Sequence, residues 1–134
     1  MRRAYLLSIT ALLLAIFIAA GLNKYSLANE KPITKAKDGY TVEELYAKKD
    51  ELKGKKVAVR GKAVRFAGGI MGKNFIHLQD GSGQKGTNDI TVTTNQSAKV
   101  GDMVLANGLM VLDRDFGGGY RYPVILEEAT ITVE

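Results

Sequence analysis

Apolar and polar residues alternate with a period of two from Lys55 to the end of the chain, and glycines punctuate the alternation. Alternation of this kind is typical of β-strands that bury one face. It predicts five strands, at residues 55–67, 74–80, 89–95, 102–113 and 120–133. Because these strands follow one another along the chain, the pattern indicates an all-β domain.

Two of the longer expected strands contain an internal glycine, Gly61 in the first and Gly108 in the fourth. A glycine inside a strand commonly marks a bulge or a sharp bend. Strands that bend at mid-length let a five-stranded sheet close on itself, so we expect a small barrel. A bulge at Gly61 would turn Val64 and Phe66 toward the interior of that barrel.

The alternation assigns the other strand residues to two faces, because successive side chains of a strand point in opposite directions. The expected core contains Val57, Val59, Ile76, Leu78, Ile90, Val92, Ala129, Ile131 and Val133. The outward face carries Phe75, His77, Gln79, Thr91 and Thr93. A threonine on an outward face contributes little to stability, so Thr91→Ala is expected to be mild.

One short helix is predicted before the strands. Thr41 and Glu44 have the spacing of a capping box, and Tyr40 and Leu45 have the spacing of a hydrophobic staple. Gly54 supplies a C-terminal stop. We therefore expect a helix that begins at Thr41 and ends before the first strand.

The N-terminus has the character of an export signal. Arg2 and Arg3 precede a run from residue 4 to 22 without a charged side chain, and Ser26-Leu27-Ala28 offers small residues at the positions that a signal peptidase reads. We expect a signal peptide at 1–28, a linker at 29–39, a domain at 40–134 and a periplasmic location. The apolar run is long enough to span a bilayer, so an uncleaved inner-membrane anchor facing the periplasm is the alternative, and the membrane is a partner only in that case.

Export changes the charge of the protein. The whole chain has 19 Lys and Arg against 14 Asp and Glu, a formal charge of +5. Residues 1–28 hold three of those cations and no acid, so the remainder carries 16 against 14, or +2. A domain with so small an excess makes few phosphate contacts, and nucleic acid is therefore an electrostatically weak partner.

The residue inventory favours binding over catalysis. The chain contains no cysteine, and its single histidine, His77, lies inside an expected strand. No nucleophile motif or metal-ligand spacing accompanies that histidine. We therefore expect no enzyme activity, no cofactor and no metal site.

A family resemblance enters at the block from Gly72 to Gly83, which reads GKNFIHLQDGSG. This block resembles a motif of small exported bacterial proteins with an OB (oligonucleotide/oligosaccharide-binding) fold, which are described as nucleic-acid-binding-like. The resemblance covers roughly residues 40–131, and it departs from the family at Phe75, where tryptophan is expected. It implies a five-stranded OB-fold barrel in an exported protein.

In an OB-fold, the face of strands two and three and the loops that join strands one to two and four to five bind the ligand. Those loops correspond here to residues 67–74 and 113–119. Aromatic rings stack on bases or sugar rings, and cations meet phosphates. The candidate ligand-binding residues are Lys73, Asn74, Phe75, His77, Arg114, Tyr120 and Tyr122.

These observations predict a periplasmic binding module without catalytic activity, whose partner is an oligomeric or protein ligand of unknown identity. One alternative is a protein that binds single-stranded DNA, RNA or an oligonucleotide. The other is a docking or assembly partner of an envelope complex. Binding to a polyanion weakens steeply with salt, whereas apolar docking does not, so salt dependence separates the two alternatives.

Overall fold

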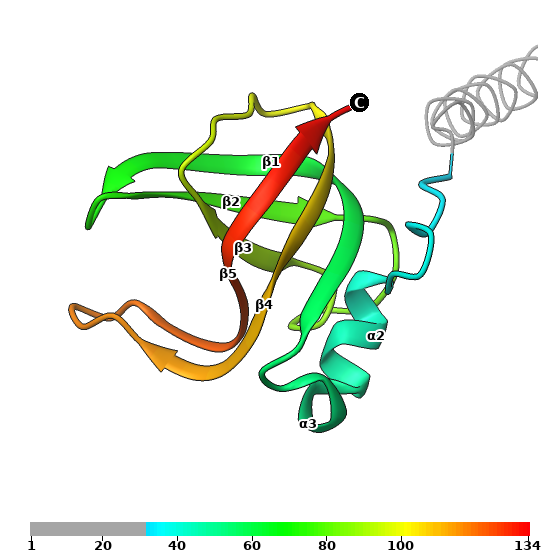
Figure 1. The fold of residues 1–134 in the computed structure, drawn as a ribbon, viewed down its shortest axis with the longest axis horizontal. Coiled ribbons are helices and arrows are strands. Elements are labelled where there is room, and N and C mark those ends of the chain that lie inside the picture. Colours follow the sequence, from blue (N-terminus) through cyan, green and yellow to red (C-terminus); the bar gives the residue numbers. More distant parts are fainter. Residues whose placement is uncertain (1–31) are drawn as a thin grey trace, which may run out of the picture. The chain divides into compact units, whose positions relative to one another are not determined.

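A computed structural model of the protein describes residues 32–134, and the expected signal peptide at 1–28 lies outside them. The described chain is mostly β-structure preceded by a short helical segment, as predicted (Figure 1). The two helices are α2 (Val42–Ala47) and α3 (Lys49–Leu52). The five strands are β1 (Lys56–Ile70), β2 (Lys73–Gln79), β3 (Ile90–Thr94), β4 (Met103–Asp115) and β5 (Arg121–Val133).

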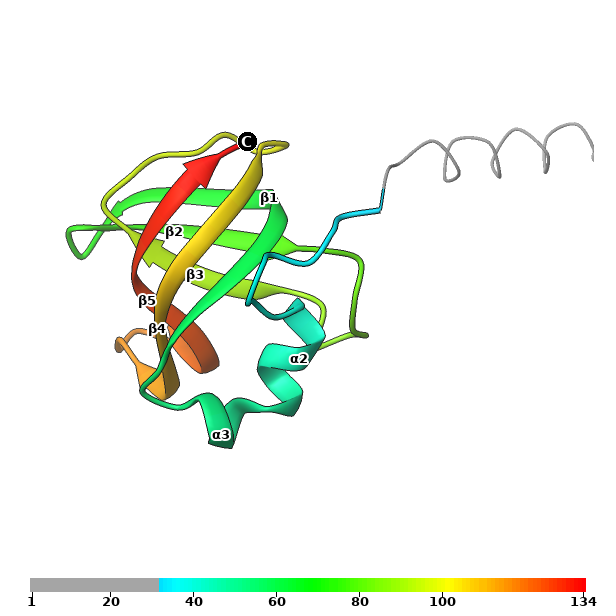
Figure 2. The ribbon, with the colours of Figure 1, turned by 45° about the vertical axis from the view of Figure 1, so that its right-hand side comes forward.

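The five strands form one mixed sheet that closes on itself in the order β1-β2-β3-β5-β4. All neighbouring pairs are antiparallel except β3 and β5, which run parallel. β1 and β4 are long and strongly curved, and each passes around the barrel in Figure 2. Closure therefore leaves no strand without a partner on both sides, which removes the open sheet edges that promote aggregation.

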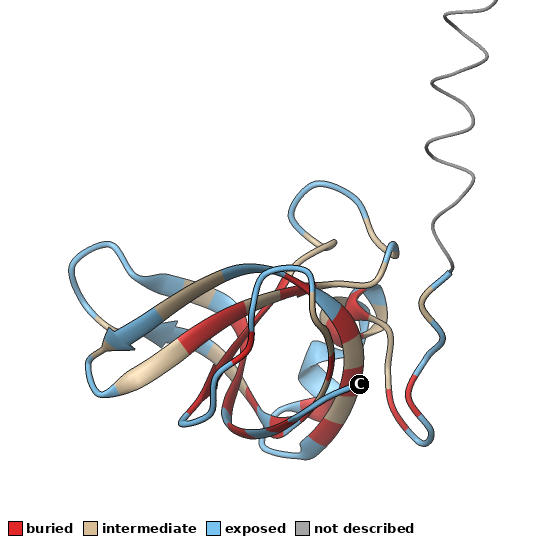
Figure 3. Ribbon diagram, turned by 90° about the horizontal axis from the view of Figure 1, so that it is seen from above, coloured by how far each residue is buried: buried red, intermediate tan, exposed pale blue. Residues whose placement is uncertain are grey.

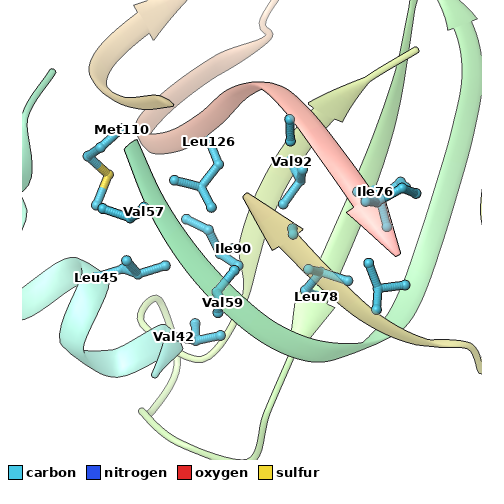
Figure 4. Packing of buried hydrophobic residues seen from close by; sticks show 14 of the residues in the cluster. Val42, Leu45, Val57, Val59, Ile76, Leu78, Ile90, Val92, Met110 and Leu126 are labelled. Atoms are coloured by element: carbon cyan, nitrogen blue, oxygen red, sulfur yellow. The ribbon is translucent and has the colours of Figure 1, made fainter. Parts of the chain in front are cut away.

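The barrel interior is filled by aliphatic side chains from every strand, and the helical segment closes one end of it. Val42 and Leu45 of α2 are fully buried in the same cluster as Val59 and Ile90. Figure 4 shows these side chains lying together, with Met110 of β4 beside Val57 of β1. Burial of each such side chain stabilises the fold by about 1.5–3 kcal/mol. Because Val42 and Leu45 are among them, α2 is part of the core.

The course of β1 differs from the expected one. The register of β1 is unbroken at Gly61 against β4 and shifts against β2 between Ala63 and Arg65. Ala63 is therefore buried and Val64 is 38% exposed, so the predicted inward position of Val64 is wrong. A Cβ at Gly61 would lie 3.0 Å from the Leu78 Cβ, and this close approach between strands accounts for the glycine.

The other expected features of the strands are mostly present. Phe66 packs against the core, and the β4–β5 register shifts at Gly108, between Asn107 and Leu109. Val133 is an exception, because it is 49% exposed at the end of β5 rather than part of the core.

The outward face of β2 and β3 is covered, contrary to expectation. Phe75 is 2% exposed, and Thr91 and Thr93 are buried as well. Figure 3 shows buried residues on the strands and exposed residues mainly at the loops and hairpin ends. The rings of Phe116 and Tyr122, from the β4–β5 hairpin, contact Phe75 and cover this part of the face. The expectation that Thr91→Ala is mild assumed an exposed side chain. Because Thr91 is buried, that expectation has lost its basis.

The helix begins as its sequence predicts. The Thr41 side chain accepts the Glu44 backbone N–H, and the Glu44 carboxylate accepts the Thr41 N–H, which completes the capping box. Gly54, just after the helical segment, adopts the left-handed conformation with φ of 77°.

The Asp80-Gly81-Ser82-Gly83 segment holds the start of α2 to the barrel. The Asp80 carboxylate accepts the Val42 N–H at 2.9 Å, and the Ser82 hydroxyl accepts the Glu43 N–H at 3.0 Å. The Gly83 N–H donates to the Glu43 carboxylate at 3.2 Å. The first N–H groups of a helix have no partner within it, so this loop satisfies groups that would otherwise need water.

Residues 33–39, the end of the expected linker, lie against the barrel. Ala36 is buried, and the Tyr40 N–H donates to the Ala58 carbonyl of β1 at 2.9 Å. The Arg60 guanidinium donates to the Thr34 carbonyl at 3.1 Å. This stretch therefore belongs to the same compact unit as the strands.

Candidate functional site

Two β-hairpins project from the same side of the barrel. The β1–β2 hairpin and the β4–β5 hairpin both lie at the left of Figures 1 and 2. A cleft of about 390 Å³ is formed by residues of both hairpins. We call this space the hairpin cleft, and its lining residues are Arg65, Phe66, Ala67, Ile70, Phe75, His77, Tyr120 and Tyr122.

Three aromatic rings pack together along the cleft. The Phe75 and Phe116 ring centroids are 5.5 Å apart in an edge-to-face arrangement, and Tyr122 lies 6.2 Å from Phe75 and 6.0 Å from Phe116. Edge-to-face pairs of this kind contribute about 0.5–1.5 kcal/mol beyond their burial. Phe75 therefore supports the two rings above it, and its buried ring offers no free face for stacking.

Tyr120 and Tyr122 are the tyrosines of the cleft. Tyr120 is 45% exposed, whereas Tyr122 is half-buried. Burial raises the pKa of Tyr122, the neighbouring Tyr120 adds to the rise, and Arg65 opposes it. A tyrosine phenol is neutral at physiological pH even at its ordinary pKa, so Tyr122 presents a hydroxyl donor beside an apolar ring.

Glu127 forms ion pairs with Lys73 and Arg114, the two cations that were predicted to contact a ligand. Its carboxylate, only 10% exposed, lies 3.8 Å from the Lys73 ammonium and 3.5 Å from the Arg114 guanidinium. Both cations also approach the Phe116 ring, Arg114 at 4.7 Å and Lys73 at 6.0 Å from its centroid. These contacts hold Phe116 in place, and they leave less positive charge for an incoming anion.

His77 is held by Asp89. Its Nδ1 lies 2.8 Å from an Asp89 carboxylate oxygen, and the other oxygen accepts the Gln79 side-chain amide at 3.3 Å. The Asp89 backbone carbonyl also accepts the Tyr46 hydroxyl of α2. This network fixes the orientation of the imidazole, because a ring nitrogen bonded to a carboxylate cannot turn freely.

Asn74 has a structural position outside the cleft. Its side-chain oxygen accepts the Gly69 N–H at 3.1 Å, and its side-chain nitrogen donates to the Gln96 carbonyl at 2.9 Å. Asn74 therefore ties the β1–β2 hairpin to the loop after β3.

The structure brings four of the seven candidate residues together in the cleft lining: Phe75, His77, Tyr120 and Tyr122. Lys73 and Arg114 lie against Phe116 and Glu127, and Asn74 lies apart. Six residues at or beside the cleft were not among the candidate residues predicted from sequence: Arg65, Phe66, Ala67, Ile70, Phe116 and Glu127. Phe116 lies in the loop at 113–119 that was expected at the site, so its place in the sequence could have identified it as a site residue. Glu127 carries no such signal, because its place depends on the irregular register of β5.

Comparison with known proteins adds no relative. No protein-family model matches the chain, and a search of curated proteins gives no match.

Within residues 32–134, no three His, Cys, Asp or Glu side chains are grouped so that they could hold a metal ion. In the same stretch, no helix has the length and apolar character that crossing a membrane requires.

Proposed function

We propose that this chain is an exported OB-fold binding module without catalytic activity, and that the hairpin cleft is its ligand site. The observation that carries the proposal is the cleft itself, an open hollow lined by aromatic rings between two hairpins. An OB-fold is a small five-stranded barrel that binds ligands on strands two and three and on the loops after strands one and four. Two observations support this proposal: five strands close into one ring, and the cleft lies between the β1–β2 and β4–β5 hairpins, although no residue of β3 lines it.

The cleft lining is suited to binding a ring. Tyr120 exposes an aromatic surface, Tyr122 offers a hydroxyl, and Arg65 adds a positive charge at the margin. Rings and flat groups stack on aromatic side chains, while the polar atoms fix their orientation. The proposed ligand therefore presents a planar group or a sugar ring, and its chemical identity is the subject of the experiments below.

Absence of catalysis is part of the proposal. The lining residues include no serine, threonine, cysteine, aspartate or glutamate that could act as nucleophile. His77, the one imidazole of the lining, is already bonded to Asp89 on its Nδ1 side.

Nucleic-acid binding is the alternative, and the pairing of Lys73 and Arg114 with Glu127 weighs against it. Docking of an envelope protein through the same hairpins is the other alternative. The proposed location is the periplasm, with an inner-membrane anchor as its alternative, and both rest on residues outside the described part of the chain.

Titration with a short oligothymidine tests two points: whether the cleft is the binding site, and whether the protein is a nucleic-acid-binding protein. We expect weak binding at physiological salt, no tighter than about 10⁻⁴ M, the weak limit of non-specific complexes. Tyr120→Ala should lower that affinity by about fivefold, the low end of the loss for one stacked base. Val100→Ala, which truncates an exposed side chain in the β3–β4 connection, is the control and should change nothing.

Two results would count against the proposal. Equal affinity of the wild type and Tyr120→Ala would remove the cleft as the binding site. Binding that is tighter than about 10⁻⁶ M and falls steeply with salt would favour a nucleic-acid-binding protein.

A further inference from the structure

A second groove lies beside the hairpin cleft, at the ends of β2 and β3. It has a volume of about 500 Å³, within the range of small-ligand sites. Its walls come from the first residue of β2, the end of β3 with the following loop, and the middle of β5. The lining residues are Lys73, Thr93, Thr94, Asn95, Gln96, Glu128, Ala129 and Thr130.

Five of the eight lining residues of the groove carry a hydroxyl or an amide group, and two others, Lys73 and Glu128, are charged. The Thr93 and Thr94 hydroxyls accept the N–H groups of Glu128 and Gln96, so each hydroxyl keeps its own hydrogen to donate. The Gln96 side chain is fixed, because both ends of its amide bond the Ile131 backbone. One wall of the groove is therefore rigid.

Three polar side chains of the groove are free to bind a ligand. Across residues 32–134, the side chains of Asn95, Glu128 and Thr130 form neither a hydrogen bond nor an ion pair with other residues. An amide, a carboxylate and a hydroxyl together offer both donors and acceptors. Such a set matches a partner that carries several hydroxyl groups.

The backbone at Glu128 is strained where it lines the groove. Its φ is 51°, a left-handed conformation that is unfavourable for a residue with a side chain. The registers of β5 with β3 and with β4 both shift near this position. Strain of this kind persists where it serves to place a group, and here Glu128 lies in the groove lining.

The charge of the groove selects against polyanions. Lys73 is the one cation among its lining residues, and Glu127 lies 3.8 Å from its ammonium. Glu128 adds a negative charge that is not paired within the described chain. A phosphate chain would meet this carboxylate without a free cation to offset it, whereas an uncharged polyhydroxyl ligand would donate hydroxyl hydrogens to it.

We propose that this groove is a second binding site and that it takes a short stretch of uncharged oligosaccharide. Hydroxyls of the sugar bond Asn95, Glu128 and Thr130, while Gln96 and the two buried threonines shape the floor. The site goes beyond the proposed function, because its lining shares no residue with the hairpin cleft.

The test is an NMR titration of the ¹⁵N-labelled protein recovered from cells that express the whole chain. The probes are chitotetraose and cellotetraose, two uncharged linear oligosaccharides, with oligothymidine as the charged comparison. We expect at least one sugar to shift the backbone amides of residues 95, 96, 128 and 130. Thr130→Ala should weaken that sugar by about three- to tenfold, as expected for one lost hydrogen bond.

Thr132→Ala is the matched control, because Thr132 is also an exposed threonine of β5 but lies outside the groove lining. Unchanged sugar affinity in Thr132→Ala, with equal melting temperatures for both variants, supports the proposal. Three outcomes overturn it: no shift with either sugar, an equal effect of the two variants, or groove shifts caused by oligothymidine. Sugar-induced shifts confined to Tyr120 and Tyr122 overturn the groove while leaving the cleft intact. Shifts confined to the groove support this site and leave the cleft to its own test.

Discussion

At the scale of single residues, the fold changes the charge state of Glu44. Its pKa falls from 4.5 to about 2, because its carboxylate accepts the Thr41 backbone N–H and then because it bonds the Lys35 ammonium. A carboxylate whose pKa is lowered by folding stabilises the protein at pH values above its unfolded pKa. That contribution is lost as the pH falls from about 4.5 toward 2.

Glu44→Gln tests this contribution. At neutral pH the variant should melt at a lower temperature than the wild type, because glutamine lacks the charge that Lys35 and the helix start favour. The difference should shrink as the pH is lowered through 4.5 toward about 2, where the wild-type carboxyl becomes protonated. Thermal unfolding followed by circular dichroism over that range measures it. A difference that stays constant at every pH would contradict the assignment.

Two residue-level expectations were wrong for reasons that lie beyond local sequence. Val64 was placed inside because Gly61 suggested a bulge, but the glycine serves a close approach to Leu78 instead. Phe75 was expected to offer a stacking face, and it is buried by Phe116, which is 41 positions away in sequence. Periodicity assigns a side chain to one face of a strand, but it does not say what covers that face.

At the scale of elements, the loop at residues 80–83 connects the helix to the barrel. Gly83 has a φ of 80°, and a Cβ at this position would lie 2.3 Å from the Thr87 carbonyl oxygen. Gly86 has a φ of 92° in the same loop region, but a Cβ there would meet nothing within 4 Å. Both glycines therefore have a positive φ, but only Gly83 lacks the space for a Cβ.

Gly83→Ala should therefore destabilise the domain more than Gly86→Ala does. Gly86→Ala bears the left-handed strain alone, about 1–2 kcal/mol. Gly83→Ala adds a collision with backbone and should cost a further 1–3 kcal/mol or so. It should also loosen the Ser82 and Asp80 bonds to α2. Urea unfolding of the two variants gives the comparison, and equal midpoints would show that the loop relaxes freely.

Elements were more predictable from sequence than their contacts. The capping box at Thr41, the five strands and the register shift at Gly108 follow from local chemistry, and the structure contains them. The docking of residues 80–83 on α2 joins segments some 40 residues apart, and no periodic signal encodes that pairing.

At the scale of the whole molecule, barrel closure creates the candidate site. Closure in the order β1-β2-β3-β5-β4 brings the β1–β2 and β4–β5 hairpins to one side, with the aromatic cluster between them. The resemblance to OB-fold proteins implied that these two loops would lie near each other, because the ligand site of that fold uses both. The sequence did not predict that Glu127 would form ion pairs with Lys73 and Arg114, because these pairs depend on the three-dimensional course of β5.

The neutralisation of those cations changes the expected ligand. Free lysine and arginine beside aromatic rings would indicate a polyanion, whereas the same residues held by a buried carboxylate mainly support Phe116. Arg65 remains as a cation of the cleft lining. A ligand with at most a small negative charge therefore fits the cleft better than a nucleic-acid strand does.

We propose that the hairpin cleft contacts the ligand in the cell, and site-specific photocrosslinking tests this contact without knowledge of that ligand. Tyr120 is replaced by p-benzoylphenylalanine, which keeps an aromatic ring at this exposed position, and Val100 receives the same group as the control. After irradiation of intact cells, intact-mass analysis of the protein detects any adduct. We expect an adduct at position 120 and none at position 100. Adducts at position 100 alone, or at both positions equally, would contradict it.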